Sequence, residues 1–177
     1  DHPGRQVTTI MYRRGTRQKY GGVFHLEGST WKKGRGSSPH TLYIAGELAS
    51  PLFVCEGEKD VDTLHNLGCN AASGEDGAGK GKWRPEYTAQ LSGLSVAVLQ
   101  DNDDIGKAYA QETAAALYGK AKSVRVLDLS QVWPDIPEHG DVSDMVAALG
   151  ADEASRRLVE LVRQTPEWEP APDPLFS

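Results

Sequence analysis

Hydrophobic residues follow two different patterns along the chain, and the pattern changes near Thr41. Before it, residues 7–13 and 20–26 alternate loosely between apolar and polar, which predicts β-strands, and the Gly-, Ser- and Lys-rich residues 28–39 predict turns. After it, apolar runs of strand length alternate with segments of helical periodicity. Continuous apolar runs are typical of parallel strands that are buried on both faces.

The second part of the chain therefore predicts an α/β fold with an open, mainly parallel, Rossmann-like sheet flanked by helices. Its predicted strands are residues 52–55, 94–99 and 124–129. Its predicted helices are residues 58–67, 104–118, 141–149 and 152–164, and Gly68 and Gly119 act as stop signals for the first two. The expected organisation is a β-rich appendage of residues 1–40, a domain of residues 41–150, a C-terminal helix of residues 151–164 and a Pro-rich tail or linker of residues 165–177.

The net charge of the 177 residues is −6, whereas proteins that bind nucleic acids usually carry a basic surplus. The charges are, however, unevenly distributed. Residues 1–40 hold eight Lys or Arg and two acidic residues, a net charge of +6, so the other 137 residues carry −12. The basic front also contains Tyr12, Tyr20, Phe24 and Trp31. It predicts a groove for single-stranded DNA, and the alternative is an appendage whose aromatic residues pack on the core.

The lengths of the apolar runs and the number of cysteines indicate which cellular compartment to expect. No apolar run approaches the roughly 18 residues of a membrane span, so no membrane partner is expected. Cys55 and Cys69 are too few for a disulfide framework and lack the spacing of a zinc site, which predicts a reducing compartment, the cytoplasm. The five histidines show no metal-ligand spacing, and no role is predicted for them.

Acidic residues follow two of the predicted strands. Residues 52–55 run directly into Glu56, and residues 94–99 are soon followed by Asp101 and Asp103, which lie on the same side of an extended segment. Carboxylates gathered at one sheet edge repel each other unless a cation lies among them, and oxygen ligands favour Mg²⁺ or Mn²⁺. The alternative is that Glu56 and residues 101–104 cap the helices that follow them.

Glu56-Gly-Glu-Lys-Asp60 after an apolar strand, followed by Asp101-x-Asp103-x-x-Gly106, resembles the TOPRIM domain of bacterial-type primases, type IA and II topoisomerases and some nucleases. The resemblance spans residues 42–150. Gly-Ala-Gly-Lys at residues 77–80, the segment 82–87 and Gly140-Asp-Val-Ser-Asp144 make it most similar to phage- and plasmid-type primases or primase-helicases.

This resemblance implies that Glu56 is a general acid or base and a metal ligand, and that Asp101 and Asp103 are catalytic metal ligands. In the mechanism that this implies, two Mg²⁺ or Mn²⁺ ions held by these residues activate a 3′-hydroxyl and stabilise the departing pyrophosphate during nucleotide addition. Asp60, one helical turn after Glu56, is expected either to have a structural role or to support the metal ligands from behind. Asp141 and Asp144 match the third acidic motif of the family, which implies metal binding, and their alternative role is to cap a helix.

Basic residues near these motifs predict contacts with nucleotide or DNA. Residues 74–80 fit the start of a P-loop, but Gly81 stands where Ser or Thr is required and Pro85 interrupts the helix. The segment predicts instead a flexible loop that brings Lys80, Lys82 and Arg84 to the acidic centre, or else a solvated surface loop.

Two further lysines complete the set of predicted nucleotide or DNA contacts. Lys59 lies within the first motif, and Lys107 follows Gly106 where the relatives often place a basic residue. The alternative for Lys107 is a solvated helix lysine.

The resemblance predicts the catalytic TOPRIM segment of a DNA primase, which makes RNA primers from nucleoside triphosphates on single-stranded DNA with Mg²⁺ or Mn²⁺. Because the chain begins at Asp1 without a methionine, we expect it to be a segment of a longer protein. The resemblance implies zinc-binding and helicase domains elsewhere in that protein. One alternative is a TOPRIM nuclease that hydrolyses phosphodiesters. Another is a non-catalytic module that binds metal or nucleic acid.

Overall fold

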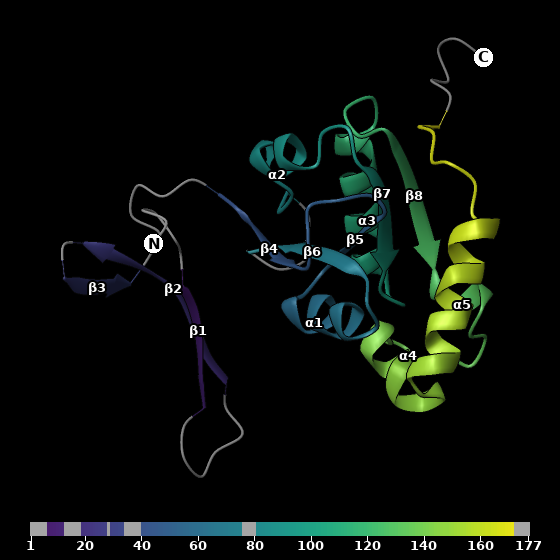
Figure 1. Cartoon of the computed structure of the whole chain (residues 1–177), viewed down its shortest axis with the longest axis horizontal. Coiled ribbons are helices and arrows are strands. Elements are labelled where there is room, and N and C mark those ends of the chain that lie inside the picture. The colour runs from purple at the N-terminus through teal and green to yellow at the C-terminus, as the bar shows by residue number, and fades with distance from the viewer. Residues whose placement is uncertain (1–6, 13–18, 28, 34–39, 76–80, 172–177) are drawn as a thin grey trace. The chain divides into compact units, whose positions relative to one another are not determined.

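The computed structural model describes residues 7–12, 19–27, 29–33, 40–75 and 81–171. The chain divides into two compact units, residues 1–39 and residues 40–177 (Figure 1). None of the described helices is long and apolar enough to cross a membrane.

The first unit is a three-stranded antiparallel sheet of β1 (Val7–Tyr12), β2 (Lys19–Glu27) and β3 (Thr30–Lys33), with β2 in the middle. The prediction of turns throughout residues 28–39 is wrong for β3, because Thr-Trp-Lys-Lys pairs with the end of β2. Thr and Trp favour strands, and most of the Gly and Ser residues of this segment, at positions 34–38, come after them. The aromatic side chains on which the predicted DNA groove depends lie outside the described part of the structure.

The second unit contains a five-stranded sheet in the order β4-β6-β5-β7-β8. Its strands are β4 (Leu42–Ala45), β5 (Leu52–Cys55), β6 (Asn70–Gly74), β7 (Ser95–Gln100) and β8 (Ser123–Asp128). Only β4 is antiparallel to its neighbour, which confirms the predicted mainly parallel α/β sheet. Every residue of β5 is buried, as expected for a central strand covered on both faces.

Strand β6 was not predicted, because Asn-Ala-Ala-Ser-Gly contains no β-branched or aromatic residue. It forms between β4 and β5, where Ala71, Ala72 and Ser73 are fully buried. Its small side chains suit this place, because both faces of the strand are covered. Tertiary context here overrides a weak local preference for strand.

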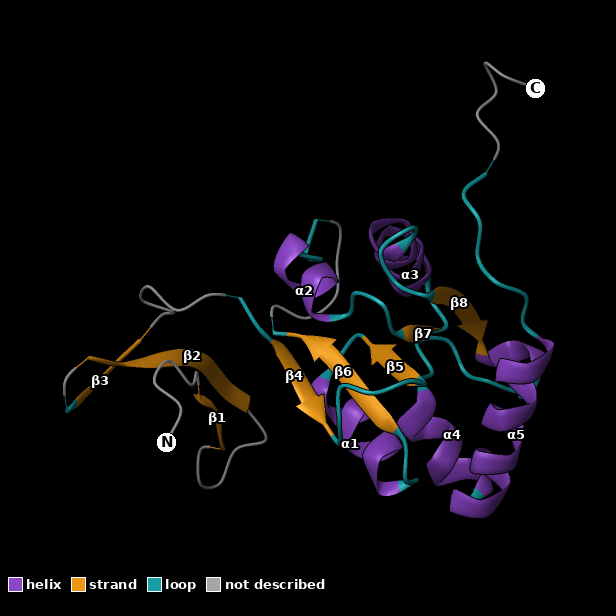
Figure 2. Cartoon of the chain, turned by 45° about the horizontal axis from the view of Figure 1, so that its top comes forward, coloured by secondary structure: helices purple, strands orange, loops and turns teal. Residues whose placement is uncertain are grey.

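Helices cover both faces of the sheet (Figure 2). On one face lie α1 (Glu58–Asn66), α4 (Val142–Leu149) and α5 (Ala151–Gln164). On the other face lie α2 (Pro85–Gln90) and α3 (Asp104–Leu117). A 3-10 turn, η1 (Leu129–Gln131), follows β8, and its Leu129 belongs to the core on the first face. Helix α2 was not predicted. Pro85 occupies its first turn, where a missing amide hydrogen costs nothing, so this proline begins a helix.

The two faces have separate hydrophobic cores. The first includes Leu64 of α1, Met145 of α4 and Leu161 of α5, and the second includes Tyr87 of α2 and Tyr109 of α3. Burying each of these side chains contributes about 1.5–3 kcal/mol to folding. The layers thereby hold the strand ends, and the polar residues that follow them, in fixed positions.

The segment after α5 contains neither helix nor strand in residues 165–171, but its first part packs against the fold. The amide of Trp168 donates to the carbonyl of Val124 in β8 at 2.7 Å, and its indole donates to the Gln111 side chain at 2.8 Å. The indole also meets the ring of Tyr118 edge-on, with ring centres 5.8 Å apart. Trp168 therefore fastens this segment across β8 and α3.

We expect Trp168→Ala to lower the free energy of unfolding by roughly 2 kcal/mol, less than the about 3–5 kcal/mol lost with a fully buried tryptophan. Urea unfolding followed by circular dichroism measures the change. Glu169→Ala, at an exposed neighbouring position, is the control and should leave stability unchanged. Equal stability of both variants would show that residues after Thr165 act only as a tail.

Candidate functional site

The candidate site lies at the sheet edge where the parallel strands β6, β5, β7 and β8 end. In open α/β sheets, this edge is where ligands bind. Glu56 follows β5 and Asp101 follows β7, and these strands are hydrogen-bonded neighbours. The structure therefore brings the two acidic motifs to adjacent positions.

Gly106, in the first turn of α3, packs against both acidic residues. A Cβ atom at this position would lie 2.7 Å from Glu56 Oε1, 2.9 Å from Asp101 Cβ and 2.9 Å from the Asp101 carbonyl oxygen. Real Cβ atoms essentially never approach other atoms so closely. Only glycine lets the helix approach the strand ends at this distance, with Glu56 and Asp101 both packed against it.

Burial and mutual repulsion shift the acidity of both residues. Burial, followed by the charges of Asp103 and Asp60, raises the pKa of Glu56 to about 7. Burial, followed by neighbouring acids of which Glu56 is the strongest, raises the pKa of Asp101 to about 8. Glu56 Oε1 is buried and has no hydrogen-bond partner. These two carboxylates are therefore poorly stabilised as anions by the protein alone.

Asp103 is in a different situation, because both of its oxygens accept hydrogen bonds. Oδ1 accepts from the Gly106 amide at 2.7 Å, which makes Asp103 the N-cap of α3, and Oδ2 lies 2.7 Å from His139 Nδ1. The bond from His139, and then that from Gly106, lower the pKa of Asp103. The capping role that the sequence left open is thus present, and the carboxylate still lies close enough to raise the pKa of Glu56.

Asp141 and Asp144 form a capping box at the start of α4. The Asp144 amide donates to Asp141 Oδ1 at 2.9 Å, and the Asp141 amide donates to Asp144 Oδ2 at 3.2 Å. Asp141 also forms an ion pair with Lys59 of α1. Lys59, which the sequence predicts to contact nucleotide or DNA, joins α1 to the start of α4 through this ion pair, and its contact with nucleotide or DNA stays a prediction.

The buried Asp60 completes the contact between α1 and α4. Its Oδ1 accepts a hydrogen bond from the Ser143 hydroxyl at 2.6 Å, and that hydroxyl is 2.8 Å from Thr63 Oγ1. Burial raises the pKa of Asp60 although the Ser143 bond opposes this. Asp60 thus links α1 to α4, and its charge also acts on Glu56 and Asp101.

The chemistry of these residues fits a hard divalent cation. The candidate ligand atoms are carboxylate oxygens, which Mg²⁺ and Mn²⁺ prefer, and the buried, unpartnered Glu56 Oε1 lies against Gly106. In this structure, however, the side chains are not arranged as a complete set of metal ligands. Across residues 40–75 and 81–171, no three His, Cys, Asp or Glu side chains are arranged to hold a metal ion.

The predicted basic contacts are dispersed. The Gly81 amide donates to both oxygens of Glu112, at 3.1 and 3.0 Å, so the segment that carries Lys82 and Arg84 runs along α3. Lys107 is exposed one residue after Gly106 and lines a hollow of about 450 Å³ next to Asp103. Lys80 lies outside the described residues.

Two residues of this edge were missed from the sequence. Glu75 follows β6, its side chain is 7% exposed, and it accepts hydrogen bonds from Tyr87 at 3.2 Å and His40 at 2.7 Å. Recognition of β6 as a strand would have placed Glu75 at the same edge as Glu56. His139, to which no role was given, contacts Asp103, and nothing in its spacing signals that contact.

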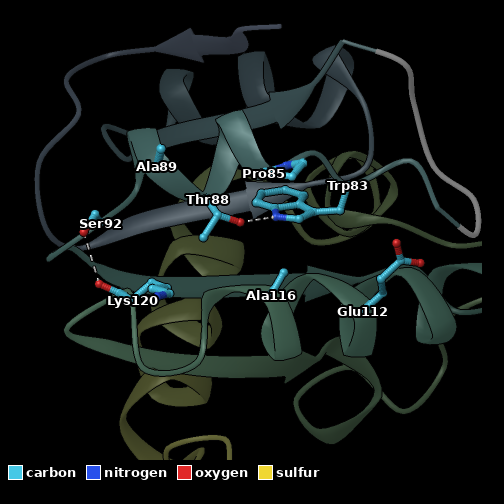
Figure 3. A pocket seen from close by; sticks show the side chains of 8 residues that line it. All are labelled: Trp83, Pro85, Thr88, Ala89, Ser92, Glu112, Ala116 and Lys120. Atoms are coloured by element: carbon cyan, nitrogen blue, oxygen red, sulfur yellow. Dashed lines mark hydrogen bonds between the residues drawn. The ribbon is translucent and has the colours of Figure 1, made fainter.

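A second hollow, also about 450 Å³, lies between α2 and α3 (Figure 3). Trp83 forms one wall, where its indole donates to the Thr88 hydroxyl at 2.9 Å, and Ala116 and Lys120 lie opposite. The Ser92 hydroxyl donates to the Lys120 carbonyl, just before the starts of β7 and β8. This hollow therefore lies toward the opposite end of the strands from Glu56 and Asp101.

A scan of family models, a search of curated proteins and a search of solved structures each find no significant match to the chain.

We expect the metal-free protein to lose stability as pH rises from about 4 to 8. A folded-state pKa of about 8 for Asp101 means that the folded chain holds a proton that the unfolded chain has released. Asp101→Asn removes this penalty, so it should raise the unfolding temperature at pH 8 by roughly 2–4 °C, the shift that about 1 kcal/mol produces at this size. The gain should disappear near pH 4.

Thermal unfolding with and without Mg²⁺ measures this effect. Mg²⁺ should raise the unfolding temperature of the wild-type protein and have little effect on Asp101→Asn. Asp104→Asn, at an exposed position three residues later, is the control and should behave as wild type. A variant that is less stable than wild type at every pH would contradict the repulsion between these carboxylates.

Gly106→Ala should destabilise the protein, although alanine normally stabilises a helix by about 0.5–1 kcal/mol relative to glycine. The new methyl group would meet the carbonyl and Cβ of Asp101, which cannot move without shifting β7. Gly57→Ala is the control, because its Cβ would make only an ordinary contact, 3.8 Å from Asp60 Oδ2. Thermal unfolding compares the two, and equal tolerance would argue against the close packing at Gly106.

Proposed function

We propose that this chain is the catalytic TOPRIM segment of a DNA primase, in which Glu56, Asp101 and Asp103 hold Mg²⁺ or Mn²⁺ for nucleotidyl transfer. The observation that carries the proposal is the pair of acidic strand ends. Glu56 and Asp101 follow adjacent parallel strands and pack against Gly106, no donor reaches the buried Glu56 Oε1, and burial and neighbouring acids raise the pKa of Asp101.

The order of the motifs supports the choice of family. The first acidic motif follows β5, the second follows β7, and the third lies at the start of α4. Helix α4 packs on α1, the helix that begins two residues after Glu56. The motifs therefore converge in space although they are widely separated along the chain. Two divalent ions bound there supply activation of a 3′-hydroxyl and neutralisation of the departing pyrophosphate.

The protein's own groups have distinct tasks in this proposal. In the metal-free protein the pKa of Glu56 is about 7, and we assign Glu56 the task of accepting the proton of the attacking hydroxyl. Asp101 and Asp103 supply negative charge for the metal ions. Lys107, exposed beside Asp103, is placed to attract the triphosphate of the incoming nucleotide.

The remaining parts of the proposal concern partners and environment. We propose that the basic residues 1–40 guide single-stranded DNA to the site, since their charge of +6 contrasts with the acidic second unit. The two unpaired thiols, Cys55 and Cys69, favour a reducing cytoplasm. We place zinc-binding and helicase domains elsewhere in the full protein.

Primer synthesis tests the proposal directly. The full protein is given single-stranded DNA, ribonucleoside triphosphates and either Mg²⁺ or Mn²⁺, and labelled RNA products are separated by size. We expect Glu56→Gln and Asp101→Asn each to lower the rate of primer synthesis at least about 100-fold. Removing a group that only hydrogen-bonds to a metal ligand typically costs about 10–100-fold, so a direct ligand should cost at least as much. The control, Asp104→Asn, should keep wild-type activity.

The same preparation separates the competing functions. Wild-type priming by both Glu56→Gln and Asp101→Asn would reject the assignment of the site. Metal-dependent loss of labelled DNA without nucleotides would identify a nuclease instead. Absence of metal binding at millimolar concentration, measured by calorimetry, would favour a module without catalysis.

A further inference from the structure

His139 has an unusual backbone conformation next to the candidate site. Its φ angle is +60°, and it is the one residue other than glycine with positive φ within the described ranges. The left-handed region is unfavourable for such residues and persists only where surrounding contacts enforce it. Such strain is often found at functional sites, so the contacts that hold His139 are informative.

Hydrogen bonds between two loops fix this conformation. The His139 amide donates to the Asn102 carbonyl at 3.1 Å, and the Asn102 amide donates to the Gly140 carbonyl at 3.0 Å. The side-chain amide of Asn102 donates to the Pro137 carbonyl at 2.9 Å. The turn of residues 137–140 is thereby attached to the segment that leads from β7 into α3.

The result of this attachment is a contact with Asp103. His139 Nδ1 lies 2.7 Å from Asp103 Oδ2, while the Gly106 amide holds the other oxygen at the same distance. The His139 side chain is 71% exposed, so burial of the ring does not explain its place. The strained turn instead presents an imidazole to one carboxylate of the acidic cluster.

We propose that His139 is a positioning residue, which fixes the orientation of the Asp103 carboxylate for metal binding beside Glu56 and Asp101. This inference rests on the proposed function of the site. Hydrogen-bond partners of metal-binding groups typically contribute 10–100-fold to metal affinity. The hollow of about 450 Å³ that His139 and Lys107 line next to Asp103 leaves this side of the carboxylate accessible to substrate.

Two substitutions separate positioning from scaffolding. His139→Gly adopts positive φ without strain but offers no donor to Asp103, whereas His139→Asn tolerates the same backbone and retains a side-chain amide. We expect Mn²⁺ affinity, measured by electron paramagnetic resonance on the full protein, to fall at least about tenfold in His139→Gly. The asparagine variant should recover a substantial part of it.

Kinetics and stability supply independent measurements. His139→Gly should lower kcat for primer synthesis while the KM for nucleotide stays within about twofold, because the nucleotide-binding groups remain. Its unfolding temperature should equal or exceed that of the wild type. Glu138→Gln, which changes an exposed charge next to His139, is the control and should leave Mn²⁺ affinity unchanged.

The outcomes distinguish this inference from the proposed function. If the wild-type protein binds Mn²⁺ and His139→Gly binds it equally well, the positioning role of His139 is overturned, and the proposed function is not affected. A loss that asparagine does not restore and that parallels a fall in unfolding temperature also overturns it. A wild-type protein that binds no Mn²⁺ overturns the proposed function and this inference with it.

Discussion

The contact between Gly106 and the ends of β5 and β7 is the constraint on which the candidate site depends. Any larger residue there would hold α3 away from the sheet, because a single added carbon would overlap both Glu56 and Asp101. Without this approach, Asp103 could not cap α3 and remain next to Glu56. The absence of a side chain at Gly106 therefore allows the carboxylates of Glu56, Asp101 and Asp103 to lie together at this edge of the sheet.

The fold was largely predictable because apolar runs mark the central strands. The runs at residues 52–55 and 94–99 identified β5 and β7 to within a residue, since both strands are covered by helices. Strand β6 could not be found in the same way, because its alanines and serine carry no preference for strand. The order of strands within the sheet depends on packing between distant segments, which no local pattern records.

The site was predictable in composition and only partly in geometry. A carboxylate that follows a buried strand must lie at the edge of the sheet, so Glu56 and Asp101 could be placed before their neighbours were known. Their proximity depended on β5 and β7 being adjacent. The contact of His139 with Asp103 depends on a backbone angle and three hydrogen bonds between loops, none of which is encoded in residue spacing.

The distribution of hydrogen-bond donors distinguishes two groups within the acidic cluster. Asp60 accepts from Ser143, Asp103 from His139 and Gly106, and Asp141 from Lys59, so each of these carboxylates has a hydrogen-bond donor within the protein. Burial and neighbouring acids raise the pKa of Glu56 and Asp101, and no donor reaches Glu56 Oε1. A fold selected for stability alone would gain from neutral side chains at these two positions. A bound cation would neutralise the charge of these two side chains, and the hydrogen-bonded acids around them provide a frame for it.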